Sequence, residues 1–138
     1  MVRYAYGTVT EMDRERLVQM MQDRYWREVY GTTLDLLQHH LEKHQTSPGE
    51  QVPRTLVTMR SEVQVRDLED DERSTYTLVY PHEANIMVGK ISVLAPLGRE
   101  LLGRRAGDMI LVHTPIGARR YKIEQVVYQP EAEGRFDL

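Results

Sequence analysis

The chain contains no cysteine among its 138 residues, which excludes disulfide bonds, cysteine-rich zinc modules, iron–sulfur clusters and thiol catalysis. It also lacks any apolar run of about 20 residues, the length that spans a bilayer. Residues 1–10 lack the charged and then apolar pattern of a secretory signal. We therefore expect a globular, cytoplasmic protein without membrane contact, built as one domain or as a small domain with an appendage.

A strong positive charge is absent as well. Eighteen lysines and arginines stand against 21 aspartates and glutamates, which gives a net charge of −3. The broad basic field that holds nucleic-acid phosphates is therefore missing, and we expect no sequence-specific binding of nucleic acid.

Catalytic and metal-binding motifs are missing too. His40 and His44 are four residues apart on a predicted helix, but no third ligand accompanies them, so we predict exposed histidines and no metal. The acidic run 69–72 has no ordered set of ligands and is interpreted as a solvated turn. No glycine-rich phosphate loop and no Gly-x-Ser-x-Gly elbow occurs. We therefore predict no catalytic residue and no cofactor.

Helical periodicity dominates residues 1–50. Thr10 is placed to cap a helix that we expect to end near Tyr25, and Gly31 allows a turn. Thr32 then caps a second helix over residues 33–44. The apolar positions that recur at spacings of three and four are Leu17, Met20, Met21, Leu34, Leu37 and Leu41. This region is predicted to be a short antiparallel, coiled-coil-like helical hairpin.

Alternating apolar and polar residues dominate residues 51–138. The expected strands cover residues 63–66, 76–80, 86–93, 109–113 and 120–128. Residues 96–104 have the content of one short helix, with Pro96 at its first turn and Gly103 at its end. The sequence therefore predicts an α+β fold, with a helical hairpin before an antiparallel half-barrel that carries one helix.

Charge is divided unevenly within this second region. Residues 88–122 hold seven basic and two acidic side chains, whereas residues 61–72 hold six acidic and one basic. Such runs are usually solvated faces. Adjacent arginines beside turns also suit an acidic protein partner, because arginine binds carboxylates in bidentate fashion.

A specific motif runs from residue 91 to residue 108, ISVLAPLGRELLGRRAGD, and is followed by TPIGA at 114–118 and YKIEQVVY at 121–128. This pattern resembles the C-terminal domain of the Gre transcript-cleavage factors. The resemblance implies an FKBP-like domain that docks on bacterial RNA polymerase, at the largest-subunit rim of the secondary channel. The segments 57–59, 78–81 and 128–134 look more like the regulators of nucleoside diphosphate kinase, a branch with a short hairpin.

The resemblance also implies which residues dock. They are Ile91, Ser92, Pro96, Leu97, Gly98, Arg104, Arg105 and Asp108. Ala95 departs from the family, whose members commonly carry serine before the proline. The glycines and Asp108 have an alternative role, which is to build the turns between the helix and the strands.

The hairpin tip decides whether such a protein can stimulate cleavage. A Gre-type factor needs two neighbouring carboxylates there to help hold the second magnesium ion of the polymerase. Between residues 25 and 32 the only acid is Glu28. We therefore expect a polymerase-binding regulator that does not cleave and that competes with the cleavage factors. Tyr25, Trp26 and Tyr30 at the tip either pack over the open end of the hairpin or contact a partner.

Two other functions stay open at this point. One is regulation of nucleoside diphosphate kinase, by direct contact or through its expression. The other is peptidyl-prolyl isomerisation of the FKBP type, which rests on fold analogy alone. That activity uses an aromatic-lined cleft, and the chain has one phenylalanine, Phe136, and one tryptophan, Trp26, so we disfavour it.

Overall fold

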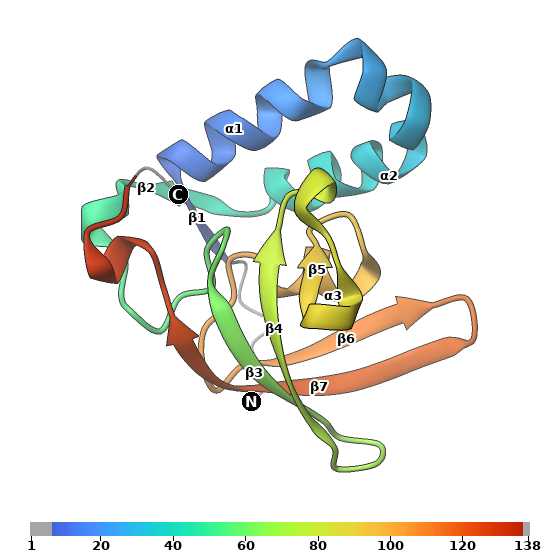
Figure 1. Ribbon diagram of the computed structural model, residues 1–138, viewed down its shortest axis with the longest axis vertical. Coiled ribbons are helices and arrows are strands. Elements are labelled where there is room, and N and C mark those ends of the chain that lie inside the picture. Colours follow the sequence, from blue (N-terminus) through green and yellow to red (C-terminus); the bar gives the residue numbers. More distant parts are fainter. Residues whose placement is uncertain (1–6, 137–138) are drawn as a thin grey trace.

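The helical hairpin lies across one end of a curled, mixed sheet in the computed structural model, which describes residues 7–136 (Figure 1). The hairpin consists of α1 (Glu11–Gln22) and α2 (Arg24–Glu42). The remaining elements are β1 (Thr8–Thr10), β2 (Gln45–Ser47), β3 (Glu62–Asp67), β4 (Arg73–Val79), β5 (Lys90–Ser92), α3 (Pro96–Leu101), β6 (Met109–Thr114) and β7 (Gly117–Tyr128). This arrangement confirms the predicted α+β class.

The hairpin turns earlier than the sequence predicts. Thr10 caps α1 as expected, since its hydroxyl accepts a hydrogen bond from the Asp13 amide at 3.0 Å. The helix then ends at Gln22, and Asp23 caps α2 by accepting from the Trp26 amide at 3.2 Å. The predicted second cap at Thr32 is wrong, because Thr32 lies inside α2. Aspartate is a strong N-cap residue, and its signal outweighs that of the glycine.

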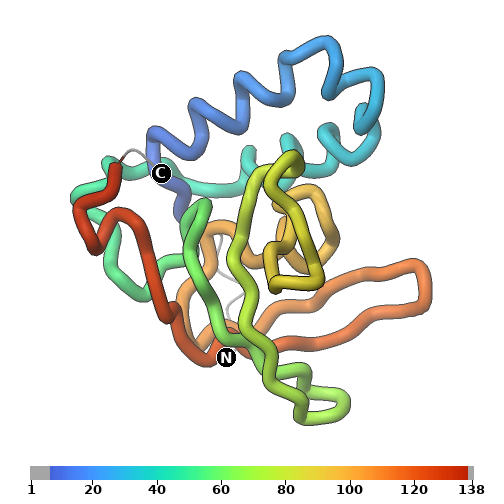
Figure 2. Tube along the Cα trace, in the orientation of Figure 1, coloured from blue at the N-terminus to red at the C-terminus, as the bar shows by residue number. Residues whose placement is uncertain are grey.

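The predicted break near Gly31 survives as a kink. Tyr30, inside α2, has a φ of −126° and a ψ of 23°, which are not helical values. The chain therefore reverses direction in two steps, at Asp23 and at Tyr30, with a short helical segment between them. Figure 2 shows this segment as the rounded end of the hairpin.

A parallel strand pair that the sequence did not predict closes the base of the hairpin. Strands β1 and β2 pair from Thr8↔Gln45 to Thr10↔Ser47. Strand β1 is also joined to the end of α3, because the Thr8 amide donates to the Gly103 carbonyl at 3.0 Å. Each strand has only three residues, too few for a visible alternation.

The main sheet has the order β5-β4-β3-β7-β6. Strand β3 is antiparallel to both of its neighbours, and β6 is antiparallel to β7. Strand β5 is parallel to β4, so the expectation of a purely antiparallel sheet is wrong at this edge. The chain can return in the parallel direction because Pro81–Glu83 and Ile86–Val88 form 3-10 turns between the two strands.

One continuous apolar cluster joins the hairpin to the sheet. Its fully buried members include Leu17, Leu34, Leu37, Val57, Met59, Val63, Leu78, Val93, Leu101, Leu102 and Ile123. Burial of each such side chain contributes roughly 1.5–3 kcal/mol. The apolar stripes that the sequence predicts for both helices are therefore buried in this cluster, where they face the sheet. A domain boundary at residue 50 stays a prediction.

Candidate partner-binding surface

Three consecutive apolar side chains project from the connection between β4 and β5. Ile86, Met87 and Val88 are 63%, 89% and 65% exposed. Single exposed apolar residues are common, but an unbroken exposed run of three is typical of an interaction site. We call Ile86–Val88 the apolar loop.

The backbone holds the apolar loop in one conformation. The Asn85 side chain accepts from the Met87 amide at 3.2 Å, and Gly89 ends the turn with a φ of 76° in the left-handed region. The Gly89 carbonyl then accepts from Thr77 of β4 at 2.8 Å. The loop is therefore attached to the sheet through backbone hydrogen bonds, which lowers the ordering entropy that binding of a partner would cost.

A shallow groove of about 300 Å³ lies on the connections on both sides of β5. It is lined by Tyr30, Thr33, Pro81, Ala84, Ser92, Leu94 and Ala95. The groove thus joins the kinked part of α2 to the segments that lead into and out of β5. Two of the segments that the resemblance assigned to docking, around Ser92 and Pro96, reach the surface here.

The structure divides the predicted docking residues into surface and core. Ser92 and Pro96 are half-buried, whereas Ile91, Leu97 and Gly98 are buried. Gly98 has a structural reason to be glycine, because a Cβ there would stand 2.0 Å from the Ser92 carbonyl oxygen. Ile91, Leu97 and Gly98 therefore pack beneath the surface and position Ser92 and Pro96.

The remaining predicted docking residues lie between α3 and β6. Arg104 is largely covered and its Nη2 is 3.5 Å from Glu100 Oε2. Arg105 is exposed, and its backbone amide donates to Asp108 Oδ2 at 2.9 Å. Asp108 therefore has the turn-forming role that was the alternative interpretation, and Arg105 presents its charge to solvent.

Each carboxylate near the hairpin tip has a local partner. Asp23 caps α2, as described above. Glu28 is 3.8 Å from Arg24, and Asp35 is paired with Arg27 at 2.5 Å. Within residues 7–136 no three histidine or acidic side chains gather in a group that could hold a metal ion.

The tip aromatics contact one another, and Trp26 also packs against the core. Trp26 stacks on Tyr30 with 5.5 Å between ring centroids and is half-buried against the core. It also approaches His82 from the β4–β5 connection at 6.4 Å. Packing, the first of the two interpretations, therefore holds for Trp26, whereas Tyr25 is 65% exposed.

The prediction that His40 and His44 are exposed is wrong. His44 is buried, and its two ring nitrogens lie 2.8 Å from the His40 carbonyl and 3.0 Å from the Leu102 carbonyl. The two rings lie 4.5 Å apart, and burial lowers the pKa of His40 to about 3. The pair therefore joins the end of α2 to the end of α3. Helical spacing alone did not reveal this, because histidine adds no signal to an apolar stripe.

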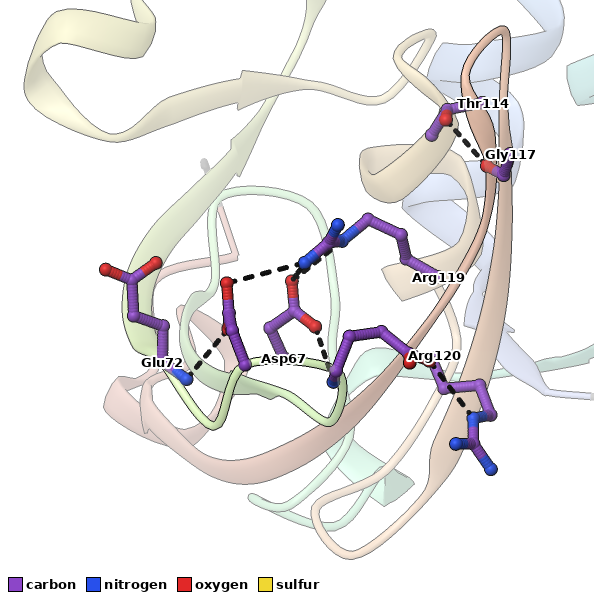
Figure 3. Close-up of polar contacts among 8 residues, drawn as sticks. Asp67, Glu72, Thr114, Gly117, Arg119 and Arg120 are labelled. Carbon is purple, nitrogen blue, oxygen red and sulfur yellow. Dashed lines mark hydrogen bonds and ion pairs between the residues drawn. The ribbon is translucent and has the colours of Figure 1, made fainter.

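The two oppositely charged segments neutralise each other in part. Arg119 of β7 donates to Asp67 Oδ2 at 2.6 and 2.9 Å, and Arg120 Nε lies 3.3 Å from Glu69 (Figure 3). Desolvation raises the pKa of Asp67, but the Glu69 amide and the Arg119 guanidinium together bring it below its usual value. These two arginines therefore bind carboxylates of the β3–β4 turn within the same chain, so they are not available to an acidic protein partner.

The apolar loop is the feature that the sequence interpretation missed as a surface. Residues 86–93 were predicted as one strand because they are rich in apolar and β-branched residues. Asn85 and Gly89 flank the loop, and both residues are typical of turns. Their positions were the available signal.

Comparison with known proteins identifies the family. The family model "Transcription elongation factor, GreA/GreB, C-term" matches residues 52–128. A protein of Escherichia coli strain K12 named "Regulator of nucleoside diphosphate kinase" is 34% identical over 131 residues, which cover 94% of this chain and 95% of that protein. The chain therefore belongs to the GreA/GreB family of transcription-factor-like regulators.

Two further relatives agree with this assignment. "Transcription elongation factor GreA" of Vibrio parahaemolyticus is 40% identical over 72 residues, which are 52% of this chain and 46% of that protein. A solved structure of a GreA/GreB elongation factor from Nitrosomonas europaea aligns with a TM-score of 0.67 at 33% identity, over 88% of this chain and 98% of that chain. These names describe regulators and elongation factors rather than enzymes. Within residues 7–136 no helix is long and apolar enough to cross a membrane.

Proposed function

We propose that the chain is a non-catalytic regulator that binds bacterial RNA polymerase near the secondary channel and competes there with the Gre cleavage factors. The observation that carries this proposal is the apolar loop. It lies in the part of the chain that the family model covers, a few residues before Ile91 and Ser92, which the family resemblance assigns to docking. A rigid apolar anchor with a polar rim is the usual core of a protein interface.

The absence of cleavage activity is proposed from the tip. Two neighbouring carboxylates free to share a magnesium ion are what the chemistry needs. The three acids near the tip instead cap a helix or pair with arginines, and the hairpin is short. At 1.5 Å per residue, the 12 residues of α1 extend only about 18 Å.

A competition titration tests the proposal. Labelled protein is titrated with core RNA polymerase, and a GreA-type cleavage factor is then added. We expect saturable binding that the cleavage factor displaces. Met87→Asp is expected to weaken binding by at least tenfold, because a carboxylate would be buried in an apolar contact.

Ile116→Asp is the matched control. Ile116 is 92% exposed at the turn between β6 and β7, so the change is the same kind of substitution at another exposed apolar site. It is expected to leave binding unchanged. Equal loss in both variants, or no binding at micromolar polymerase, would refute docking through the apolar loop.

A cleavage assay tests the second half of the proposal. Backtracked elongation complexes are incubated with this protein alone, with a cleavage factor alone and with both. We expect no cleavage above the intrinsic rate with this protein, and inhibition of the factor in the mixture. Stimulated cleavage by this protein alone would overturn the non-catalytic assignment.

Action on nucleoside diphosphate kinase is the second candidate function. It is favoured by the name of the Escherichia coli relative, which matches this chain over nearly its full length. Complex formation with purified kinase, measured by the same labelled protein, distinguishes direct contact from an effect through transcription.

A further inference from the structure

A second concave site lies between the hairpin and the sheet, apart from the surface described above. This cleft has a volume of about 520 Å³, which is the size of an ordinary small-molecule site. It is lined by Arg16, Gln19, Met20, Asp23, Trp26, Arg60, Tyr80 and His82. None of these residues lines the docking groove.

Aromatic rings form one side of the cleft. Trp26 and His82 lie 6.4 Å apart between centroids, and His82 is 6.3 Å from the ring of Tyr80. The rings come from the hairpin tip and from the β4–β5 connection, so the two parts of the fold build this side together. A planar ligand ring can stack on such a surface, as nucleic-acid bases stack on aromatic side chains.

Two guanidinium groups line the cleft, and the charge of one of them, Arg60, is balanced by Glu83. Arg60 bonds to Glu83 through Nε and Nη2 at 3.1–3.2 Å and lies over the Tyr80 ring at 5.1 Å. Its Nη1 takes no part in these contacts. The fork of Arg60 is therefore held in place with donors still directed away from Glu83, which suits recognition of a phosphate. Arg16 of α1 lines the same cleft.

The third chemical group is the Asp23 carboxylate at the turn between α1 and α2. One of its oxygens caps Trp26, and a carboxylate has acceptor capacity for further donors. Carboxylates commonly accept from the hydroxyls of a ribose or the N–H groups of a base. Stacking rings, guanidinium groups and one acceptor thus surround a single cavity.

We propose that this cleft binds a nucleoside phosphate. The base stacks against Trp26 and His82, and the phosphates bind Arg16 and Arg60. The Asp23 carboxylate accepts from the sugar or the base. A simple anion would leave the rings unused, and an apolar ligand would use neither the remaining donors of Arg60 nor the remaining acceptor capacity of Asp23. The inference does not depend on polymerase docking.

The chain supplies its own reporter for this site. Trp26 is the only tryptophan in the sequence, so its fluorescence reports on the cleft alone. ADP and GDP are titrated into the whole protein with correction for their absorption, and calorimetry gives the affinity independently. We expect a saturable change in Trp26 fluorescence, and weaker binding of adenosine and of pyrophosphate than of the intact nucleotides.

Two arginine substitutions provide the matched comparison. Arg60→Gln is expected to weaken nucleotide binding by about tenfold, since it removes charge-assisted hydrogen bonds. Arg54→Gln removes the same charge from an exposed ion pair with Glu133 outside the cleft and is expected to leave binding unchanged. If Arg60→Gln fails to fold, which circular dichroism shows, Arg16→Gln takes its place.

The outcomes separate clearly. Saturable binding that the cleft substitution weakens and the control does not supports the proposal. No saturable change at millimolar nucleotide refutes it, as do equal effects of the two substitutions. Pyrophosphate that binds as tightly as the nucleotides would show an anion site without base recognition, and would also overturn it.

Discussion

Asp13 shows how one buried side chain connects the two parts of the molecule. Although it lies in the first turn of α1, its Oδ2 accepts from the backbone amide of Met59 at 2.9 Å. The side chain is 1% exposed. Burial raises its pKa to about 7, with a contribution from Glu131, while the Met59 amide and Arg16 act in the opposite direction. The carboxyl is therefore costly to ionise where it stands.

This cost makes stability depend on pH. The unfolded carboxyl has a pKa near 3.9, so between about pH 4 and pH 7 the folded state binds more protons than the unfolded state. The free energy of unfolding contributed by Asp13 therefore falls as pH rises through this window. Asp13→Asn keeps an acceptor oxygen and removes the charge. We expect its stability relative to the parent to increase by about 2 kcal/mol from pH 5 to pH 8, measured by urea unfolding.

Glu15→Gln serves as the control for this experiment. Glu15 is an exposed acid on the same helix, so its removal is expected to leave the pH profile of the parent unchanged. A parent whose stability is flat across this window, or an Asn variant that follows the same profile as the parent, would contradict the role given to Asp13.

Helix α3 and strand β5 pack through a close approach of their backbones. Three residues separate the end of β5 at Ser92 from the start of α3 at Pro96, and the helix can approach that strand only because Gly98 has no Cβ. We expect Gly98→Ala to destabilise the protein by about 3 kcal/mol, since a backbone carbonyl must move. The thermal midpoint of unfolding gives the measurement.

Gly31 is the matched site for this substitution. It lies inside α2, where a Cβ would meet no other atom within 4 Å, and its φ is not in the left-handed region. Gly31→Ala is therefore expected to stabilise the protein, by up to about 1 kcal/mol, because alanine favours a helix. Shifts of the same sign and size in both variants would show that α3 does not need its close approach.

Elements were predictable to the extent that their signals are local. The two apolar stripes, the Thr10 cap and the strands β3, β4, β6 and β7 all follow from periodicity within a few residues. Strand β5 and the β1–β2 pair have three residues each, so their pairing depends on neighbours far along the chain. The position of the hairpin turn was misplaced because two turn signals, Asp23 and Gly31, compete within nine residues.

The candidate surfaces were harder to predict for the same reason. The family motif assigns Ser92 and Pro96 to docking, which stays a prediction, and it gives no information on which of their neighbours are buried. The cleft is built by Trp26, Arg60 and His82, residues separated by 34 and 22 positions, and only the fold brings them together. The ion pair between Arg119 and Asp67 could not be predicted for the same reason, because the two residues are 52 positions apart in the sequence.

At the scale of the whole molecule, the shared core predicts cooperative unfolding. Leu17, Leu34 and Leu37 of the hairpin are as fully buried as Val63 and Leu78 of the sheet. We expect one transition in urea, seen alike by Trp26 fluorescence in the hairpin and by far-ultraviolet circular dichroism of all elements. Leu37→Ala is expected to lower stability by about 2–5 kcal/mol in both signals together.

Leu36→Ala is the neighbouring control for this prediction, since Leu36 is 50% exposed on the same helix and is expected to have little effect. If the tryptophan signal changed at lower urea than the circular dichroism, the hairpin would unfold by itself, and the boundary predicted at residue 50 would mark two independent units.

The short β1–β2 pair has a mechanical consequence for the hairpin. Its strands attach the start of α1 and the end of α2 side by side, and the Gln45 amide also bonds to the Gly7 carbonyl at 3.0 Å. The segment from Thr8 to Ser47 is therefore closed at its base like a ring. A load on the tip is shared by two anchored ends, so neither helix can separate from its terminus unless the strand pair breaks.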